Sequence, residues 1–218
     1  MRKIPVQLFN LKGKTALITG SSSGLGERFA RILSLAGARV ILSARRLNQL
    51  ESLTDELQNV ECIELDVSSK ESVTAAIDQL ERGGERIDIC INNAGIAIAT
   101  PIFEPDDNGD FERTLQTNVM GVWYVTKAIA NHMKKYDIKG SIINIGSVNG
   151  DAIPAMQGAA YSISKAAVIH LTKTLVGELS PNKIRINCIS PGWVRTPMNG
   201  AEVENVIPHI PYGDIGEP

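Results

Sequence analysis

The chain has 218 residues, of which 43% are hydrophobic and 21% are charged, and its formal net charge is −2. These values are typical of a globular protein with one sizeable core. They argue against a nucleic-acid or membrane-surface protein, which would show a clustered basic face, and no apolar stretch reaches the ~18 residues that a membrane-spanning helix needs.

Short runs rich in isoleucine and valine alternate with longer amphipathic runs along the chain. The short runs are apolar on both faces and predict buried parallel strands over residues 15–20, 38–44, 60–66, 87–93, 140–146 and 183–190. The longer runs predict helices over residues 24–37, 47–57, 70–82, 111–136 and 158–180. This alternation predicts right-handed crossovers and one α/β domain, a doubly wound parallel sheet between two layers of helices.

The first predicted strand runs directly into a glycine-rich turn, TGSSSGLG (19–26), and a helix begins at once. Gly20 permits a tight turn, and we expect Gly24 and Gly26 to let the backbone approach a pyrophosphate. The helix N-terminus offers free N–H groups and a positive dipole to the same anion. A turn without any ligand is the simpler alternative. We favour a dinucleotide site because ligands of doubly wound sheets bind at the carboxyl ends of the strands.

The end of the second predicted strand, LSARR (42–46), indicates which dinucleotide is bound. Sites that prefer NAD usually carry a carboxylate there, which binds the ribose 2′-hydroxyl. Ala44 occupies that position, and Arg45 and Arg46 follow it. Guanidinium groups bind a 2′-phosphate, which a carboxylate would repel. The sequence therefore predicts NADP(H), with Arg45 as the main contact of the 2′-phosphate and Arg46 in support. The alternative is that both arginines are solvated residues at the start of a helix and bind no ligand.

The apolar run 158–180 carries Tyr161 and Lys165 one helical turn apart. Residues at this spacing lie on the same face of a helix. A neighbouring ammonium favours a phenolate, so we expect Lys165 to lower the pKa of Tyr161 from its usual value of about 10. Two side chains that only extend their polar tips to water are the alternative.

The glycine-rich turn, the Tyr161–Lys165 pair and five other motifs resemble those of the short-chain dehydrogenases/reductases, a family with a one-domain Rossmann fold. The motifs are TGSSSGLG (19–26), the Asp66–Val67 pair, NNAG (92–95), Asn118 in LQTNVMG, Ser147 in IGSVNG, YSISK (161–165) and PGWVRT (191–196). They cover residues 13–198 in the order of the family. The resemblance implies that residues 1–218 form a single NADP-binding domain with a built-in catalytic site. It also implies that this site interconverts a carbonyl compound and a secondary alcohol.

The resemblance implies a role for each matching residue. Asn118, Ser147, Tyr161 and Lys165 would form a catalytic tetrad. Tyr161 would be the general acid/base and Ser147 would bind the substrate oxygen. Lys165 would hold the nicotinamide ribose, and Asn118 would fix a water that connects Lys165 to solvent. The cofactor would contact Gly20, Ser22, Ser23, Gly24, Leu25, Gly26, Arg45, Arg46, Asp66, Val67, Asn93, Ala94, Gly95, Tyr161, Lys165, Pro191, Gly192, Val194 and Thr196. Within this set, residues 66–67 would meet the adenine, 93–95 the adenosine ribose and 191–196 the nicotinamide.

The substrate is left open by the sequence. Candidate pocket walls form a mostly apolar set, which suits a hydrophobic carbonyl compound: Ile98, Ile153, Met156, Trp193 and Met198. The resemblance points first to 3-oxoacyl-(acyl-carrier-protein) reductases, with sugar or polyol dehydrogenases as the alternative. A non-enzymatic dinucleotide sensor or scaffold is the rival from another class, and the intact tetrad counts against it.

Cysteine and histidine usage bears on compartment and metals. Three single cysteines without CxxC spacing predict reduced core thiols, and the basic N-terminus lacks the apolar segment of a secretory signal, so we expect a cytoplasmic protein. The three histidines are far apart and show no metal-ligand spacing, so we expect no metal site.

The end of the chain and the assembly raise two further expectations. Residues 216–218 read Gly-Glu-Pro, which usually opens a helix, so we expect the domain to lack its last helix and strand. Residues 191–218 would then be a truncated substrate lid. The resemblance also implies a homodimer or homotetramer that uses the helices predicted over 111–136 and 158–180.

Overall fold

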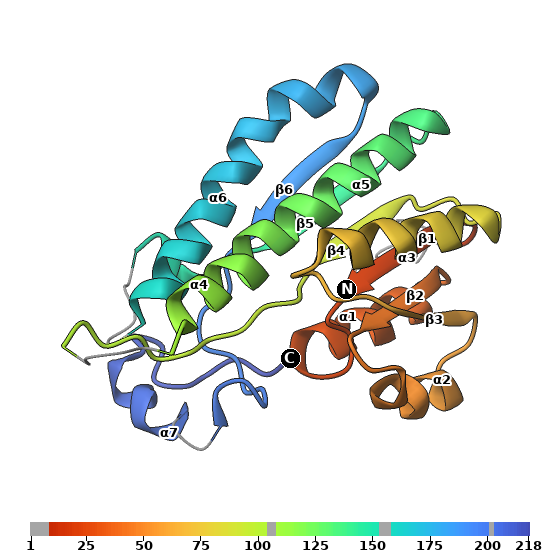
Figure 1. The fold of residues 1–218 in the computed structure, drawn as a ribbon. Helices are drawn as coiled ribbons and strands as arrows, with labels where there is room; N and C mark the ends of the chain where they lie inside the picture. Colours follow the sequence, from red (N-terminus) through yellow and green to blue (C-terminus); the bar gives the residue numbers. More distant parts are fainter. Residues whose placement is uncertain (1–8, 104–107, 153–157, 201–202) are drawn as a thin grey trace, which may run out of the picture.

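The computed structural model describes residues 9–103, 108–152, 158–200 and 203–218. Within these ranges, six strands form one sheet in the order β3-β2-β1-β4-β5-β6, and every pair is parallel (Figure 1). The strands are β1 (Thr15–Thr19), β2 (Arg39–Ala44), β3 (Val60–Glu64), β4 (Ile89–Asn92), β5 (Ser141–Ile145) and β6 (Arg185–Ile189). The chain winds outward in both directions from the β1–β4 pair, which confirms the predicted doubly wound sheet.

Helices cover both faces of the sheet in three layers, as predicted. The helices are α1 (Gly24–Leu35), α2 (Glu51–Glu56), α3 (Lys70–Arg82), α4 (Asp110–Leu115), α5 (Gly121–Lys135), α6 (Ala159–Leu179) and α7 (Val203–Val206). Short 3₁₀ turns are η2 (Leu47–Leu50), η4 (Val148–Gly150), η5 (Ser180–Asn182) and η7 (Ile207–His209). Successive residues of a strand point to opposite faces. Leu17 therefore packs with α3, α5 and α6, whereas Ile18 packs with α1 and α2.

The long helix predicted over 111–136 is interrupted in the structure. A π-helical turn, Gln116–Met120, separates α4 from α5 and contains the fully buried Asn118. Such turns insert an extra residue into a helix and are frequent at functional sites. Gly121 follows directly, and a Cβ there would lie 2.9 Å from the Val67 side chain. The local hydrophobic pattern continues through this turn, so it gave no sign of the interruption.

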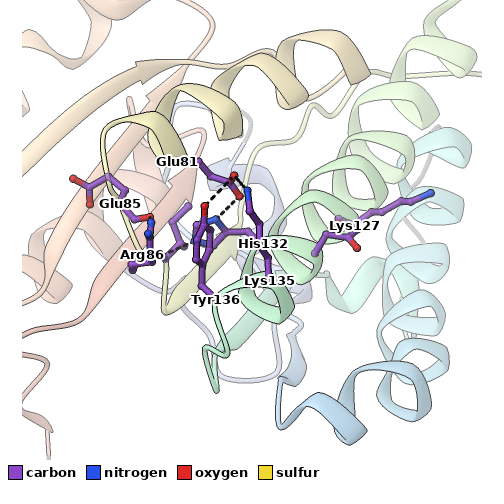
Figure 2. A network of polar contacts seen from close by, with 9 residues as sticks. Glu81, Glu85, Arg86, Lys127, His132, Lys135 and Tyr136 are labelled. Carbon is purple, nitrogen blue, oxygen red and sulfur yellow. Dashed lines mark hydrogen bonds and ion pairs between the residues drawn. The ribbon is translucent and has the colours of Figure 1, made fainter.

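A polar network joins α3 to α5 near the amino-terminal ends of the strands (Figure 2). The Glu81 carboxylate accepts hydrogen bonds from Lys135 Nζ and from Tyr136 Oη, and one of its oxygens lies 2.9 Å from His132 Nδ1. On the other side of the buried His132 ring, Nε2 accepts the Ile87 backbone N–H at 3.1 Å. An acceptor role at Nε2 places the imidazole hydrogen on Nδ1, facing Glu81. The network thus ties α3 and the segment before β4 to α5.

Replacing Glu81 by Gln should remove a stabilising contribution that depends on pH. Hydrogen bonding from Lys135, which outweighs desolvation, and from His132 lowers the pKa of Glu81. A carboxyl with a lowered folded-state pKa stabilises the fold above its unfolded value of about 4.3, and this contribution is lost as the pH falls through the folded-state pKa. We expect the difference in unfolding free energy between wild type and Glu81→Gln to be constant from about pH 5 to 7. Below about pH 4 it should shrink.

Urea denaturation at a series of pH values measures this difference. Glu178→Gln is the control, because Glu178 is an exposed glutamate of α6. A Glu81→Gln effect of equal size at pH 3 and pH 7 would contradict an ionic role for the Glu81 carboxylate.

Residues 191–200 and 203–218 lie at the same end of the sheet as the glycine turn. A Cβ on Gly24 would lie 3.2 Å from Thr196. Within the segment, Arg195 N–H donates to the Gly216 carbonyl at 2.8 Å, and Gly216 N–H donates to the Trp193 carbonyl at 2.9 Å. Ile215 beside them is buried. Among all described residues, no helix has the length and apolar character needed to cross a membrane.

Candidate active site

A cavity of about 680 Å³ opens at the carboxyl ends of the strands. Parallel strands bring these ends to one edge of the sheet, where the following loops meet. The volume lies within the range of small-molecule and cofactor sites. Its lining includes most of the residues that the sequence predicts: Gly20, Ser22, Ser23, Gly24, Leu25, Arg45, Asp66, Val67, Asn93, Ala94, Gly95, Ser147, Tyr161, Lys165, Pro191, Gly192, Val194 and Thr196. Gly26, Arg46 and Asn118 are not part of this lining.

The glycine turn between β1 and α1 needs glycine at three positions for different reasons. Gly20 and Gly24 have φ values of +64° and +57°, which side chains with a Cβ rarely adopt. Gly26 is buried, and a Cβ there would lie 2.2 Å from the Gly20 carbonyl oxygen and 2.5 Å from Asn93 Nδ2. Gly26 is therefore a packing position that lets α1 approach the turn. It does not line the cavity, although the sequence predicts that it contacts the cofactor.

Asn93 also holds the glycine turn in place. Its Nδ2 donates to the carbonyl oxygens of Thr19 at 3.1 Å and Gly20 at 2.9 Å. The Thr19 hydroxyl accepts the backbone N–H groups of Asn93 and Ala94. Side chains and backbone after β4 thus fix the loop after β1. This bracing is an additional role for Asn93, for which the family resemblance implies a contact with the adenosine ribose.

The segments after β2 and β3 form one part of the cavity wall. Arg45 and Arg46 are both exposed, but only Arg45 contributes to the lining. Gln49, one turn further along, also lines the cavity and was not singled out from the sequence. The Asp66 carboxylate accepts the N–H and the hydroxyl of Ser68, at 2.9 and 2.7 Å. These contacts fix the Asp66 side chain on the loop after β3.

Tyr161, Lys165 and Ser147 come together where β5 meets the start of α6. Lys165 Nζ lies 5.6 Å from the centre of the Tyr161 ring and donates to the Ile145 carbonyl at 2.8 Å. Ser147 follows β5 and caps η4. Gly150, at the end of this turn, lets it lie directly on α6, because a Cβ there would be 2.5 Å from the α6 backbone.

Burial dominates the electrostatics of this group. Burial raises the pKa of Tyr161 above its usual value, and a hydrogen bond from Ser147 acts in the opposite direction. Burial also lowers the pKa of Lys165 to about 8, while interaction with Cys188 acts to raise it. The expectation that Lys165 lowers the pKa of Tyr161 is therefore wrong for the protein alone. Burial of the phenol is the largest influence on the pKa of Tyr161, and Lys165 Nζ hydrogen-bonds to the Ile145 carbonyl.

Asn118 contacts the backbone after β4 instead of lining the cavity. Its Oδ1 accepts the Ile96 N–H at 2.8 Å, and its Nδ2 donates to the Ile96 carbonyl at 2.8 Å and to Ser164 Oγ at 3.0 Å. These bonds use both amide hydrogens. Gly95 borders the space between Asn118 and Lys165, because a Cβ on Gly95 would lie 3.2 Å from Asn118 Oδ1 and 3.6 Å from Lys165 Nζ.

The wall around the predicted substrate end is more polar than the sequence suggested. Ile98, Trp193 and Met198 line the cavity as predicted, whereas Ile153 and Met156 lie outside the described residues. Three asparagines that sequence reasoning missed also contribute: Asn149, Asn199 and Asn205. Asn149 could have been noticed from its place two residues after Ser147. Among the described residues, no cluster of three or more histidine, cysteine or acidic side chains could hold a metal ion.

Comparisons with known proteins agree with this geometry. The family model described as short chain dehydrogenase matches residues 14–206. Oxidoreductase UcpA of Escherichia coli (strain K12) is 41% identical over 213 residues, which cover 95% of this chain and 79% of that protein. The 3-oxoacyl-[acyl-carrier-protein] reductase FabG of Thermotoga maritima is 33% identical over 217 residues, 95% of this chain and 87% of that protein.

A solved structure extends the agreement to the backbone. The crystal structure of a gluconate 5-dehydrogenase from Burkholderia cenocepacia J2315, in complex with NADP and tartrate, matches with a TM-score of 0.88 and 34% sequence identity. The match covers 97% of this chain and 86% of that one. The match to the family model, the sequence identity and the shared fold agree: this chain belongs to the short-chain dehydrogenase/reductase family of oxidoreductases.

Proposed function

We propose that this protein is an NADP(H)-dependent oxidoreductase that interconverts a carbonyl compound and a secondary alcohol, with Tyr161 as the general acid/base. One observation carries the proposal. The partly buried Tyr161, together with the buried Ser147 and Lys165, lines the same cavity as the glycine turn and Arg45. One cavity can therefore hold both a dinucleotide and a small carbonyl compound.

The residues present fit a nicotinamide dinucleotide. Gly20 and Gly24 keep the turn before α1 free of side chains, and the N-terminus of α1 favours the pyrophosphate. Asp66 and Val67 would meet the adenine, and residues 191–196 would surround the nicotinamide. Lys165 would hold the ribose hydroxyls. When bound, NADP(H) supplies or accepts the hydride.

Tyr161 would move the proton. Its raised pKa keeps the phenol protonated at neutral pH, so it can donate a proton to the substrate oxygen during carbonyl reduction. In the reverse direction it would take the proton from the alcohol. Ser147 would hydrogen-bond the same oxygen and orient the substrate. Asn118 and Lys165 would flank a water beside Gly95 that returns the proton from solvent.

The substrate we place first is a 3-oxoacyl thioester. Two observations favour this choice. The apolar side chains of Ile98, Trp193 and Met198 line the cavity and suit an acyl chain. The Thermotoga maritima relative is a 3-oxoacyl-[acyl-carrier-protein] reductase. A sugar acid or polyol is the second candidate. The asparagines of the cavity wall and the likeness to a gluconate 5-dehydrogenase favour it. Coenzyme consumption with a panel of 3-oxoacyl thioesters, keto sugar acids and simple ketones separates the two candidates. Tight NADPH binding without turnover of any compound would favour the alternative of a non-enzymatic dinucleotide sensor or scaffold.

Cofactor preference is expected to depend on Arg45. Replacing Arg45 by Ala removes a charged hydrogen-bond donor to the 2′-phosphate, which lowers kcat/KM for NADPH about 10- to 100-fold. The value for NADH should change less than about twofold, because NADH lacks that phosphate. Arg46→Ala is the matched control, since Arg46 is also exposed but does not line the cavity. Coenzyme-dependent initial rates measure both ratios, and an unchanged NADPH preference in Arg45→Ala would contradict this role.

We further propose a homodimer or homotetramer in the cytoplasm, with residues 191–218 as a lid over the nicotinamide end of the cavity. Ile163 and Val176 support an α6 interface, because both are about half exposed on that helix. The free state of all three cysteines supports a reducing compartment.

A further inference from the structure

Asn149 makes two contacts with the Ser147 hydroxyl. Its backbone N–H donates to Ser147 Oγ at 3.1 Å, and its side-chain Oδ1 accepts the Ser147 hydroxyl at 3.2 Å. Both residues lie on the η4 turn and line the cavity beside Tyr161. Ser147 itself is buried.

A serine hydroxyl has one hydrogen, so its acceptors compete. A hydrogen bond that Ser147 donates to Tyr161 lowers the pKa of Tyr161. While Ser147 donates to Asn149 instead, it offers Tyr161 only a lone pair, and a lone pair stabilises the protonated phenol. A phenolate at Tyr161 needs the hydrogen of Ser147, and taking it breaks the bond to Asn149 Oδ1. The Asn149 side chain therefore acts on Tyr161 through Ser147.

We propose that Asn149 is a positioning residue that holds the hydroxyl hydrogen of Ser147 and thereby favours the protonated form of Tyr161, which donates to a carbonyl. This inference rests on the proposed role of Tyr161 as the acid/base. It implies that the form of the site that can donate a proton to a carbonyl persists to higher pH.

The other ionisable groups near Tyr161 do not depend on the Asn149 side chain. Lys165 lies on the same helix and donates to the Ile145 carbonyl. Cys188 on β6 influences Lys165. Asp151 ends the η4 turn and is exposed. A change caused by Asn149→Ala can therefore be assigned to the Ser147 hydrogen.

The test is an NMR titration of Tyr161 in protein with ¹³C-labelled tyrosine rings, assigned by comparison with Tyr161→Phe. In Asn149→Ala, the titration midpoint of Tyr161 should fall by about half a unit to one unit, because one neutral hydrogen bond no longer competes for the Ser147 hydrogen. Asn149→Asp should raise the midpoint, because a carboxylate holds that hydrogen more strongly and adds negative charge. In proteins that also carry Ser147→Ala, adding Asn149→Ala should change the titration midpoint of Tyr161 by less than about 0.2 unit.

Two results would overturn the inference. One is an unchanged midpoint in both Asn149 variants. The other is an equal fall for Asn149→Ala with and without Ser147, which would show an action that bypasses the serine. The titration uses neither substrate nor coenzyme, so it decides the role of Asn149 even if no carbonyl compound is turned over. Absence of turnover would count against the proposed function alone.

Discussion

Replacing Tyr161 by Phe should lower kcat by about 10²- to 10⁴-fold, the usual contribution of a positioned proton donor. Phenylalanine keeps the ring and its packing at the start of α6 and removes only the hydroxyl. NADPH affinity should therefore stay within about twofold of wild type, because an interaction that acts only in the transition state lowers kcat and leaves binding intact. Initial rates with a carbonyl substrate and a fluorescence titration with NADPH measure the two quantities.

Tyr212→Phe is the control for the loss of a phenol hydroxyl. Tyr212 is 90% exposed and does not line the cavity, so its variant should match wild type in both measurements. Wild-type turnover in Tyr161→Phe would exclude Tyr161 as the acid/base. An equal loss in kcat and in NADPH affinity would instead assign it to cofactor binding.

Replacing Gly26 by Ala should damage both stability and dinucleotide binding. The added methyl would lie 2.2 Å from the Gly20 carbonyl oxygen, so either α1 or the glycine turn must move. Overpacking of this kind costs about 1–3 kcal/mol or more. Because Gly20 lies in the lining of the cavity, we also expect the affinity for NADPH to fall by about tenfold or more, as a misplaced turn loses hydrogen bonds to the pyrophosphate. Urea denaturation and NADPH titration measure these effects.

Gly177→Ala is the matched control for the same chemical change. Gly177 lies in α6, and a Cβ there would meet nothing within 4 Å. Alanine is favoured over glycine inside a helix, so this variant should be equal to wild type or more stable by up to about 1 kcal/mol. A Gly26→Ala protein as stable as Gly177→Ala would contradict the close packing of α1 on the turn.

The fold could be predicted from the sequence because its signals are local. Each β-branched run between turns became a strand of the parallel sheet, and the amphipathic runs became its covering helices. The π-helical turn at Gln116–Met120 had no such signal. Its Asn118 hydrogen-bonds to Ile96, a contact between segments far apart in the chain.

The composition of the cavity was also largely predictable, whereas its electrostatics were not. Motif positions identified most of the lining, because residues just after parallel strands meet at one edge of the sheet. The pKa of Tyr161 depends on how deeply the phenol is buried, which spacing along a helix does not reveal. Likewise, Glu81 and His132 gave no local sign of their contact, because they lie on different helices.

A crystal structure of the protein with NADP⁺ tests the central claim most directly. The account predicts the nicotinamide ring beside the Tyr161 hydroxyl, the ribose hydroxyls on Lys165 and the 2′-phosphate on Arg45. A dinucleotide bound outside this cavity, or one whose nicotinamide lies away from Tyr161, would contradict it.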